Sequence, residues 1–144
     1  MIYREAQIKD IPHIMAVRLA VKENVLADLS RVSRADCEEY LTRRGRGWVC
    51  ELQDQIVGFA VVDLQENNVW ALFILPEYEG RGIGRKLHHM MLDWYFSRGK
   101  SYLWLTTGMN TRAEKFYESC GWLKTGPYGD DEVKFEMRAD DWLC

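Results

Sequence analysis

The chain has 144 residues, of which 47% are hydrophobic and 28% charged, and its formal net charge at pH 7 is −3. This size and composition predict one ordered globular domain with a buried core and exclude a disordered chain. The negative charge disfavours a protein whose whole surface coats nucleic acid, and the apolar runs are shorter than the roughly 20 residues that a membrane-spanning helix requires.

Cysteine and histidine spacing argues against a metal or disulfide scaffold. The four cysteines form no Cys-x-x-Cys pair and are scattered along the chain: Cys37, Cys50, Cys120 and Cys144. The three histidines show no metal-ligand spacing. Reduced thiols and an opening sequence without an export signal predict a cytoplasmic protein, and no metal cofactor is expected.

The first part of the chain predicts a strand followed by two helices. Residues 2–6 are a strand candidate, and Asp10 is placed to cap a helix that carries Pro12 in its first turn. Ser33, three residues before Asp36, gives a variant of the capping box that opens a helix. The stretch between these two helices has weak periodicity and predicts no particular element.

The rest of the chain alternates strands and helices, with turn residues between them. The expected strands cover residues 48–52, 56–63, 69–75, 102–107, 122–125 and 132–137, and the expected helices run from about residue 84 to 98 and from 111 to 120. Thr111 and Glu114 predict a capping box, and Gly99 and Gly121 predict left-handed helix ends. The order β-α-α-β-β-β-α-β-α-β-β predicts an α/β fold with a mixed central sheet, in one domain of residues 1–144.

The strongest functional signal lies between the strand at residues 69–75 and the helix that follows it. This strand is apolar on both faces, which predicts that it is covered on both sides, and Pro76 ends it. Three glycines and three basic residues come next: Gly80, Gly82 and Gly84, with Arg81, Arg85 and Lys86. Glycine tolerates positive φ and close approach of a ligand, and the first N–H groups of a helix attract anions. The stretch therefore predicts a binding site for a pyrophosphate group.

Spacing narrows the kind of phosphate site. The ATPase loop needs Gly-Lys-Ser/Thr at its end, whereas Gly84 is followed by Arg85 and Lys86. The dinucleotide fingerprint Gly-x-Gly-x-x-Gly does not fit the alternating glycines either. The alternative without a ligand is a tight connection between a strand and a helix, in which the glycines serve only the turn.

Three segments resemble signatures of the GCN5-related N-acetyltransferase (GNAT) family. Residues 79–84 resemble its coenzyme loop, Gln/Arg-x-x-Gly-x-Gly/Ala, except that Glu79 replaces the Gln or Arg. Residues 110–122, with the pattern Asn-x-x-Ala-x-x-Phe-Tyr-x-x-x-Gly-Trp, resemble the second signature. Residues 4–14 resemble the usual first strand and helix. The three matches occur in the family's order and extend over nearly the whole chain.

The resemblance implies a GNAT-like acyl-CoA N-acyltransferase fold and acetyl transfer from acetyl-CoA to a primary amine of a small molecule or of a peptide or protein terminus. It implies coenzyme binding along the strand and the glycine loop, at Phe73, Ile74, Leu75, Arg81, Gly82, Ile83, Gly84 and Arg85. It also gives the Ile74 amide the role of polarising the thioester carbonyl. Tyr117 would contact the coenzyme and protonate the departing thiolate, and Asn110 would bond a pantetheine amide. The alternatives are packing for Tyr117 and a local turn for Asn110.

The sequence does not identify the general base. Some family members place a Glu near the start of the central strand, where this chain has Asn68. The candidates are a water chain and four side chains: Glu51, Asp63, Glu66 and His13. The missing base and Glu79 leave a second hypothesis, a non-catalytic acyl-CoA-binding or sensing domain, and the glycine loop leaves a third, a nucleotide-binding module. No nucleic acid or membrane partner is expected, and the resemblance allows a homodimer.

Overall fold

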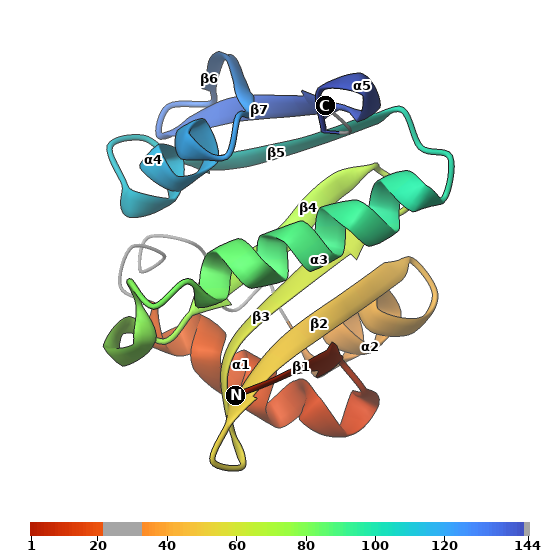
Figure 1. Ribbon diagram of the computed structural model, residues 1–144, viewed down its shortest axis with the longest axis vertical. Helices are drawn as coiled ribbons and strands as arrows, with labels where there is room; N and C mark the ends of the chain where they lie inside the picture. The colour runs from red at the N-terminus through yellow and green to blue at the C-terminus, as the bar shows by residue number, and fades with distance from the viewer. Residues whose placement is uncertain (22–32, 143–144) are drawn as a thin grey trace. The chain divides into compact units, whose positions relative to one another are not determined.

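The computed structural model describes residues 1–21 and 33–142, so Cys144 and the stretch between the first two helices lie outside the described residues. The chain forms two compact units, and the boundary between them lies between Trp94 and Tyr95. Figure 1 draws the first unit from red to green and the second from green-blue to blue. Along the described residues the elements follow the predicted order, with added 3-10 turns and a short C-terminal helix.

The first unit contains four antiparallel strands that pair in sequence order. These strands are β1 (Ile2–Glu5), β2 (Gly45–Leu52), β3 (Gln55–Asp63) and β4 (Asn68–Ile74). Positive φ angles at Gln53 and Asp54 form the tight turn between β2 and β3, where the sequence predicts a turn. β3 is the most buried strand, because every residue after Gln55 is buried.

Three helices cover the two faces of these strands. They are α1 (Ile11–Ala20), preceded by a 3-10 turn at Ile8–Asp10, α2 (Arg34–Thr42) and α3 (Ile83–Ser97), which begins in this unit. α1 and α2 lie on one face and α3 crosses the other (Figure 1). Trp48 of β2 contacts Trp94 of α3, with ring centroids 5.5 Å apart. The neighbouring Gly47 faces the other side, where an added Cβ would collide with Leu41 of α2.

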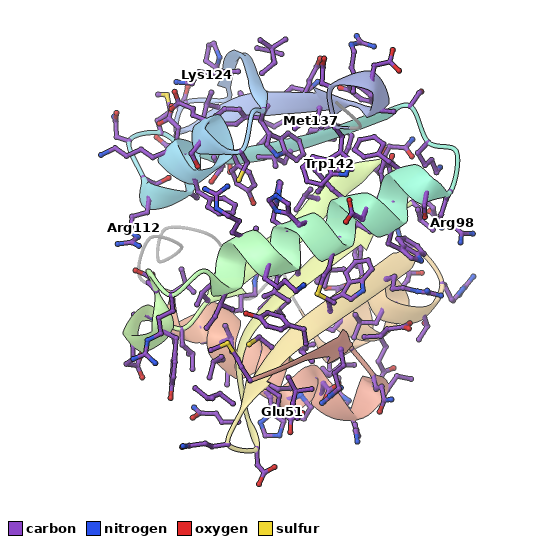
Figure 2. The ribbon with its side chains drawn as sticks, in the orientation of Figure 1. Glu51, Arg98, Arg112, Lys124, Met137 and Trp142 are labelled. Atoms are coloured by element: carbon purple, nitrogen blue, oxygen red, sulfur yellow. The ribbon has the colours of Figure 1, made fainter. Side chains whose placement is uncertain are left out.

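A buried carboxylate ties β1 to the start of α1. Asp10 is 3% exposed and accepts hydrogen bonds from Arg4 Nη1 (2.8 Å), Arg4 Nη2 (2.9 Å) and the Gln7 N–H (2.8 Å). Arg4 also donates through Nε to Glu51 of β2 at 3.1 Å, and Figure 2 labels Glu51. The prediction that Asp10 caps α1 is wrong, because its side chain makes no cap hydrogen bond to α1 and instead accepts the Gln7 N–H at the start of the preceding 3-10 turn.

The second unit contains three antiparallel strands, with β7 between the other two. Its elements are β5 (Tyr102–Gly108), α4 (Arg112–Ser119), β6 (Leu123–Tyr128), β7 (Glu132–Arg138) and α5 (Ala139–Trp142). Met137 on β7, labelled in Figure 2, is 3% exposed and pairs with Leu103 on β5. The Tyr95 hydroxyl donates to the Tyr102 carbonyl at 2.6 Å, which ties the end of α3 to the start of β5.

Most predicted helix ends are confirmed. Ser33 and Asp36 form both hydrogen bonds of the capping box on α2. Gly99 and Gly121 have φ angles of 82° and 91°, which are the left-handed ends expected after α3 and α4. β4 differs from the prediction in its burial: two of its residues are buried and the other five are half-buried. Within the described ranges, no helix combines the length and apolarity needed to cross a membrane.

We expect Asp10→Asn to lower the free energy of unfolding at pH 7 by about 2–3 kcal/mol, because it leaves the Arg4 guanidinium without its buried partner. Hydrogen bonding to Arg4 holds the pKa of Asp10 below its ordinary range. The stabilisation is therefore complete above the ordinary value of about 3.9 and is lost as the pH falls through the lower folded pKa. Denaturant unfolding of both proteins between pH 7 and pH 2 measures the difference.

Glu38→Gln is the matched control, since it breaks the exposed Arg34–Glu38 pair (3.2 Å) within α2. We expect this change to cost less than about 0.5 kcal/mol at every pH. Equal effects of the two substitutions would contradict a stabilising role for the buried pair.

Candidate functional site

The end of β4 is fixed by backbone hydrogen bonds on both sides of Leu75. The Leu75 N–H donates to the Val57 carbonyl of β3 at 2.8 Å, and the Leu75 carbonyl accepts from the Tyr78 N–H at 2.9 Å. A 3-10 turn at Pro76–Tyr78 follows, because proline cannot extend the β ladder. The main chain thus leaves the strand at a defined residue, and both backbone groups of Leu75 are engaged within the unit.

Two left-handed glycines turn the chain from this 3-10 turn into α3. Gly80 and Gly82 have φ angles of 77° and 83°, and an added Cβ at either would meet no atom within 4 Å. The glycines are therefore required by backbone conformation, and the space beside them is open. The Gly82 carbonyl accepts the Lys86 N–H at 3.1 Å and begins the helix. Gly84 lies inside α3 without a positive φ, so only two of the three glycines serve the turn.

The start of α3 is an anion-attracting surface. First-turn N–H groups of a helix have no intrahelical acceptor and lie at its positive end. Arg81, Gly82, Arg85 and Lys86 are exposed, whereas Ile83 is 1% exposed and anchors the first turn in the core. The Arg81 guanidinium lies 5.0 Å from the Tyr78 ring, which holds it beside the turn. Exposed main chain, open space and positive charge together fit a phosphate group.

The three predicted site residues at the end of β4, Phe73, Ile74 and Leu75, differ in backbone direction. Successive residues of a strand direct their N–H groups to opposite edges. Leu75 and Phe73 direct theirs toward β3, because the Leu75 N–H donates to Val57 and Phe73 pairs with Phe59 two residues away in the same ladder. The Ile74 N–H therefore points away from β3. Ile74 is the one of the three whose amide is not directed into this ladder.

Two candidate bases are already committed to ion pairs. Asp63 is 1% exposed, lies 2.7 Å from Arg44 Nη2 and accepts the Gln65 N–H at 2.9 Å. Glu51 accepts from Arg4 Nε at 3.1 Å, as described above. Glu66 and His13 are exposed. Asn68 stands at the start of β4, and its buried Oδ1 has no hydrogen-bond partner among the described residues.

In the second unit, Asn110 occupies the turn between β5 and α4. Asn110 is exposed, with a left-handed φ of 61°, and its N–H donates to Glu114 Oε1 at 2.6 Å. Thr111 Oγ1 accepts the Glu114 N–H at 3.2 Å. The predicted capping box is therefore only half formed, because the Glu114 carboxylate takes the amide of Asn110 rather than that of Thr111. Lys124 holds this carboxylate from β6 at 2.8 Å.

Tyr117 is buried in the second unit, with 5% of its surface exposed. Its ring packs at 5.6 Å from Trp122 and 6.0 Å from Phe135, measured between centroids. Burial raises the pKa of Tyr117 above its ordinary value, with a smaller contribution from the nearby Cys120. A phenol in this setting stays protonated at neutral pH, which suits a proton donor.

The structure also contains a buried histidine on α3. His88 is fully buried, and burial lowers its pKa to about 3, with smaller contributions from His89 and Arg85. His89 donates through Nδ1 to the Arg85 carbonyl at 2.7 Å, which fixes its tautomer. His88 is therefore a neutral packing residue at physiological pH. Among residues 1–21 and 33–142, no group of His, Cys, Asp or Glu side chains is arranged to hold a metal ion.

Arg18 is a half-buried charged group that the sequence analysis missed. It lies near the end of α1, and its guanidinium carbon is 5.3 Å from the centre of the Phe73 ring on β4. A signal was present, since position 18 continues the 3- and 4-residue spacing of the buried Ile11 and Ile14. A charge at an apolar-face position is unusual enough to indicate a function.

The predicted residues divide between the two units. Phe73, Ile74, Leu75 and residues 81–85 come together at one end of the first unit, where β4 ends and α3 begins. Asn110 and Tyr117 belong to the second unit, on the turn before α4 and on α4 itself.

Comparison with known proteins identifies the family. The model of the acetyltransferase (GNAT) family matches residues 15–122, which is more than half of the chain. An uncharacterised N-acetyltransferase of Archaeoglobus fulgidus is 31% identical over 109 residues, or 65% of this chain and 74% of that protein.

Solved structures share the fold. The PaiA N-acetyltransferase of Thermoplasma acidophilum, in complex with coenzyme A, has a TM-score of 0.83 at 15% identity, over 95% of this chain and 98% of that one. The ribosomal-protein-S18-alanine N-acetyltransferase of Escherichia coli has a TM-score of 0.78 at 17% identity, over 96% and 93% of the two chains. The chain therefore belongs to the acetyltransferase (GNAT) family, with its acyl-CoA N-acyltransferase fold, and is an N-acetyltransferase.

Proposed function

We propose that the enzyme transfers the acetyl group of acetyl-CoA directly to a primary amine of a small molecule or of a peptide or protein terminus. The observation that carries this proposal is the turn from β4 into α3, where Gly80 and Gly82 adopt left-handed conformations beside open space and exposed positive charge. Residues 1–144 act as a single catalytic domain in this proposal, since the family match extends across both compact units.

The main chain of residues 81–85 binds the pyrophosphate of the coenzyme: Arg81, Gly82, Ile83, Gly84 and Arg85. Helix N-termini stabilise anions through their N–H groups and dipole, and the exposed guanidinium of Arg81 adds charge beside the turn. Glu79 replaces the family's usual Gln or Arg without removing any of these backbone donors. Binding through main-chain groups therefore tolerates the departure from the family pattern.

The end of β4 positions the thioester. The Ile74 N–H, which points away from β3, donates to the thioester carbonyl oxygen and stabilises the negative charge that develops there. Phe73 and Leu75 flank this donor on the pantetheine side. Since both Leu75 backbone groups are engaged within the first unit, we assign Leu75 a packing contact rather than a donor role.

Tyr117 supplies the proton that completes the reaction. The amine nitrogen forms a bond to the carbonyl carbon as the carbon–sulfur bond breaks, and the phenol of Tyr117 protonates the departing thiolate. The phenolate then regains a proton from water. Asn110, exposed on the turn before α4, donates its side-chain amide to the pantetheine arm. Its backbone N–H serves the turn itself through Glu114.

Water accepts the proton of the substrate ammonium in this proposal. The ion pairs of Asp63 with Arg44 and of Glu51 with Arg4 leave neither carboxylate free for that role. We further propose a cytoplasmic location, on the basis of cysteine spacing. A purely acyl-CoA-binding role is not favoured, because the family match and the named relatives are N-acetyltransferases.

Gly82→Ala should weaken coenzyme A binding at least about tenfold, because alanine disfavours the left-handed conformation and its Cβ occupies the open space beside the turn. Gly99→Ala is the matched control, since Gly99 has a φ of 82° and similarly open surroundings at the other end of α3. Both changes should cost about 1 kcal/mol of stability. Calorimetric titration with coenzyme A then separates them, and equal affinities of the two variants would contradict the proposed phosphate site.

Tyr117→Phe should lower kcat about a hundredfold with little change in KM, because it removes only the proton donor. Tyr128→Phe is the control, since Tyr128 is a half-exposed tyrosine of the same unit, on β6. Thiol release from acetyl-CoA at saturating amine measures both variants. A rate unchanged by Tyr117→Phe would remove this residue from the mechanism.

The pH dependence of kcat offers an independent check of the same group. Burial raises the pKa of Tyr117, and this group acts as a proton donor only in its protonated form. Deprotonation of Tyr117 should therefore lower kcat only above the ordinary pKa of a tyrosine. We expect no descending limb in kcat below about pH 10. A descending limb near pH 8 that Tyr117→Phe abolishes would show an acidic phenol and contradict the assignment.

A further inference from the structure

A cation–aromatic cluster joins α1 and α2 to β4 in the first unit. We call it the Arg18 cluster, and its members are Arg18, Tyr40, Trp70 and Phe73. The rings of Tyr40 and Trp70 stack with centroids 4.1 Å apart and planes 10° from parallel. The Arg18 guanidinium carbon lies 5.8 Å from the Trp70 ring and 5.3 Å from the Phe73 ring. Two aromatic residues on β4 therefore restrict the position of this side chain.

Arg18 differs from the other half-buried arginines of this unit in having no anionic partner among residues 1–21 and 33–142. Arg4 is paired with Asp10 at 2.8 Å, and Arg44 with Asp63 at 2.7 Å, each a nearly fully buried carboxylate. Within residues 1–21 and 33–142, Arg18 forms no ion pair, and its buried Nε has no hydrogen-bond partner.

The part of the chain that the structure describes places no neutralising charge beside Arg18. Burial lowers the pKa of Arg18, which means that its position disfavours the charged form, although a guanidinium remains protonated in proteins. The neighbouring Cys37 is 2% exposed, and burial raises the pKa of its thiol, so it stays neutral. A half-buried charge that no described carboxylate neutralises is destabilising unless an anion compensates for it, and a bound ligand can supply that anion.

The cluster lies beside the strand that we assign to the thioester. Phe73, whose ring contacts Arg18, directly precedes Ile74, the proposed donor to the thioester carbonyl. An anion on Arg18 would therefore be held close to the reacting end of β4. A carboxylate matches the planar guanidinium with two parallel hydrogen bonds, whereas a polycationic amine would be repelled.

We propose that Arg18 binds the carboxylate of the acceptor, so that the substrate is a small amine that also carries a carboxylate, such as a free amino acid. This inference rests on the proposed acetyl transfer and adds the substrate class. Arg18 acts as a specificity residue that contacts the acceptor and takes no part in proton transfer.

The test compares L-amino acids with their matched α-carboxamides as acceptors, with thiol release from acetyl-CoA as the measurement. Wild-type enzyme should use its best amino acid at least about tenfold better in kcat/KM than the corresponding amide. Arg18→Gln should lower kcat/KM for that amino acid by about 10- to 100-fold, mainly by raising KM, and should leave the amide within about twofold. Arg18→Lys keeps the charge but not the paired donors, so its kcat/KM for the amino acid should lie between those of the wild type and Arg18→Gln.

Arg34→Gln is the matched control, because Arg34 is a half-exposed arginine of α2 whose partner Glu38 lies on the same helix. Arg34→Gln should leave kcat/KM unchanged for both the amino acid and its amide. Calorimetry with acetyl-CoA should give the same affinity for all four proteins. Titration of N-acetyl amino acids and their N-acetyl amides into the coenzyme A complex measures carboxylate binding without turnover, and only the acids should lose affinity in the Arg18 variants.

The outcomes separate this inference from the function on which it rests. Acetyl-CoA binding with equal or better turnover of amides or polyamines overturns the carboxylate assignment alone, as does a loss in Arg18→Gln that is equal for acid and amide. Acetyl-CoA binding without turnover of any amino acid also overturns it. Failure to bind acetyl-CoA contradicts the proposed function, and the inference about Arg18 falls with it.

Discussion

The hydrogen bond from the Leu75 N–H to the Val57 carbonyl is the last link between β4 and β3, and the proposed coenzyme site depends on where that ladder ends. Pro76 prevents any extension, so the chain turns at once toward α3. β3 is buried along almost its whole length, and Ile83 anchors the first turn of α3 in the core. The connection between β4 and α3 is short and both of its ends are held in place. The Ile74 amide is therefore fixed relative to the first turn of α3, as binding one extended coenzyme requires.

Features set by neighbouring residues were the predictable ones. The order of elements, the left-handed turn at Gly80 and Gly82 and the glycine ends of the helices follow from local backbone chemistry, and the structure has them. The two errors in capping share one cause. Asp10 and Glu114 each stand where a helix cap needs a carboxylate, but other donors take them, Arg4 in one case and the Asn110 amide in the other. Sequence spacing shows which carboxylates could cap a helix but not which donor each of them binds.

The same limit explains what the sequence left open about the site. Asp63 was a reasonable candidate base by position, yet the structure commits it to Arg44, a residue 19 positions away. The direction of the Ile74 amide depends on strand register, and register with β3 is a tertiary property. Arg18 was visible as a charge at an apolar-face position, but the buried Nε without a partner among the described residues became evident only from the structure.

The choice of proton acceptor and the charge on Arg18 bear on the same step. An amine must lose a proton before it attacks, and a positive charge nearby lowers the pKa of an ammonium group. An acceptor held through its carboxylate on Arg18 would bring its amine close to that positive charge, which would lower the pKa of its ammonium group. A nearby carboxylate base would have the opposite effect on this pKa, although it could accept the proton. Asp63 and Glu51 are both paired with arginines, and in this proposal the charge on Arg18 favours the free amine. Water is then a sufficient acceptor, because the equilibrium it must shift is smaller.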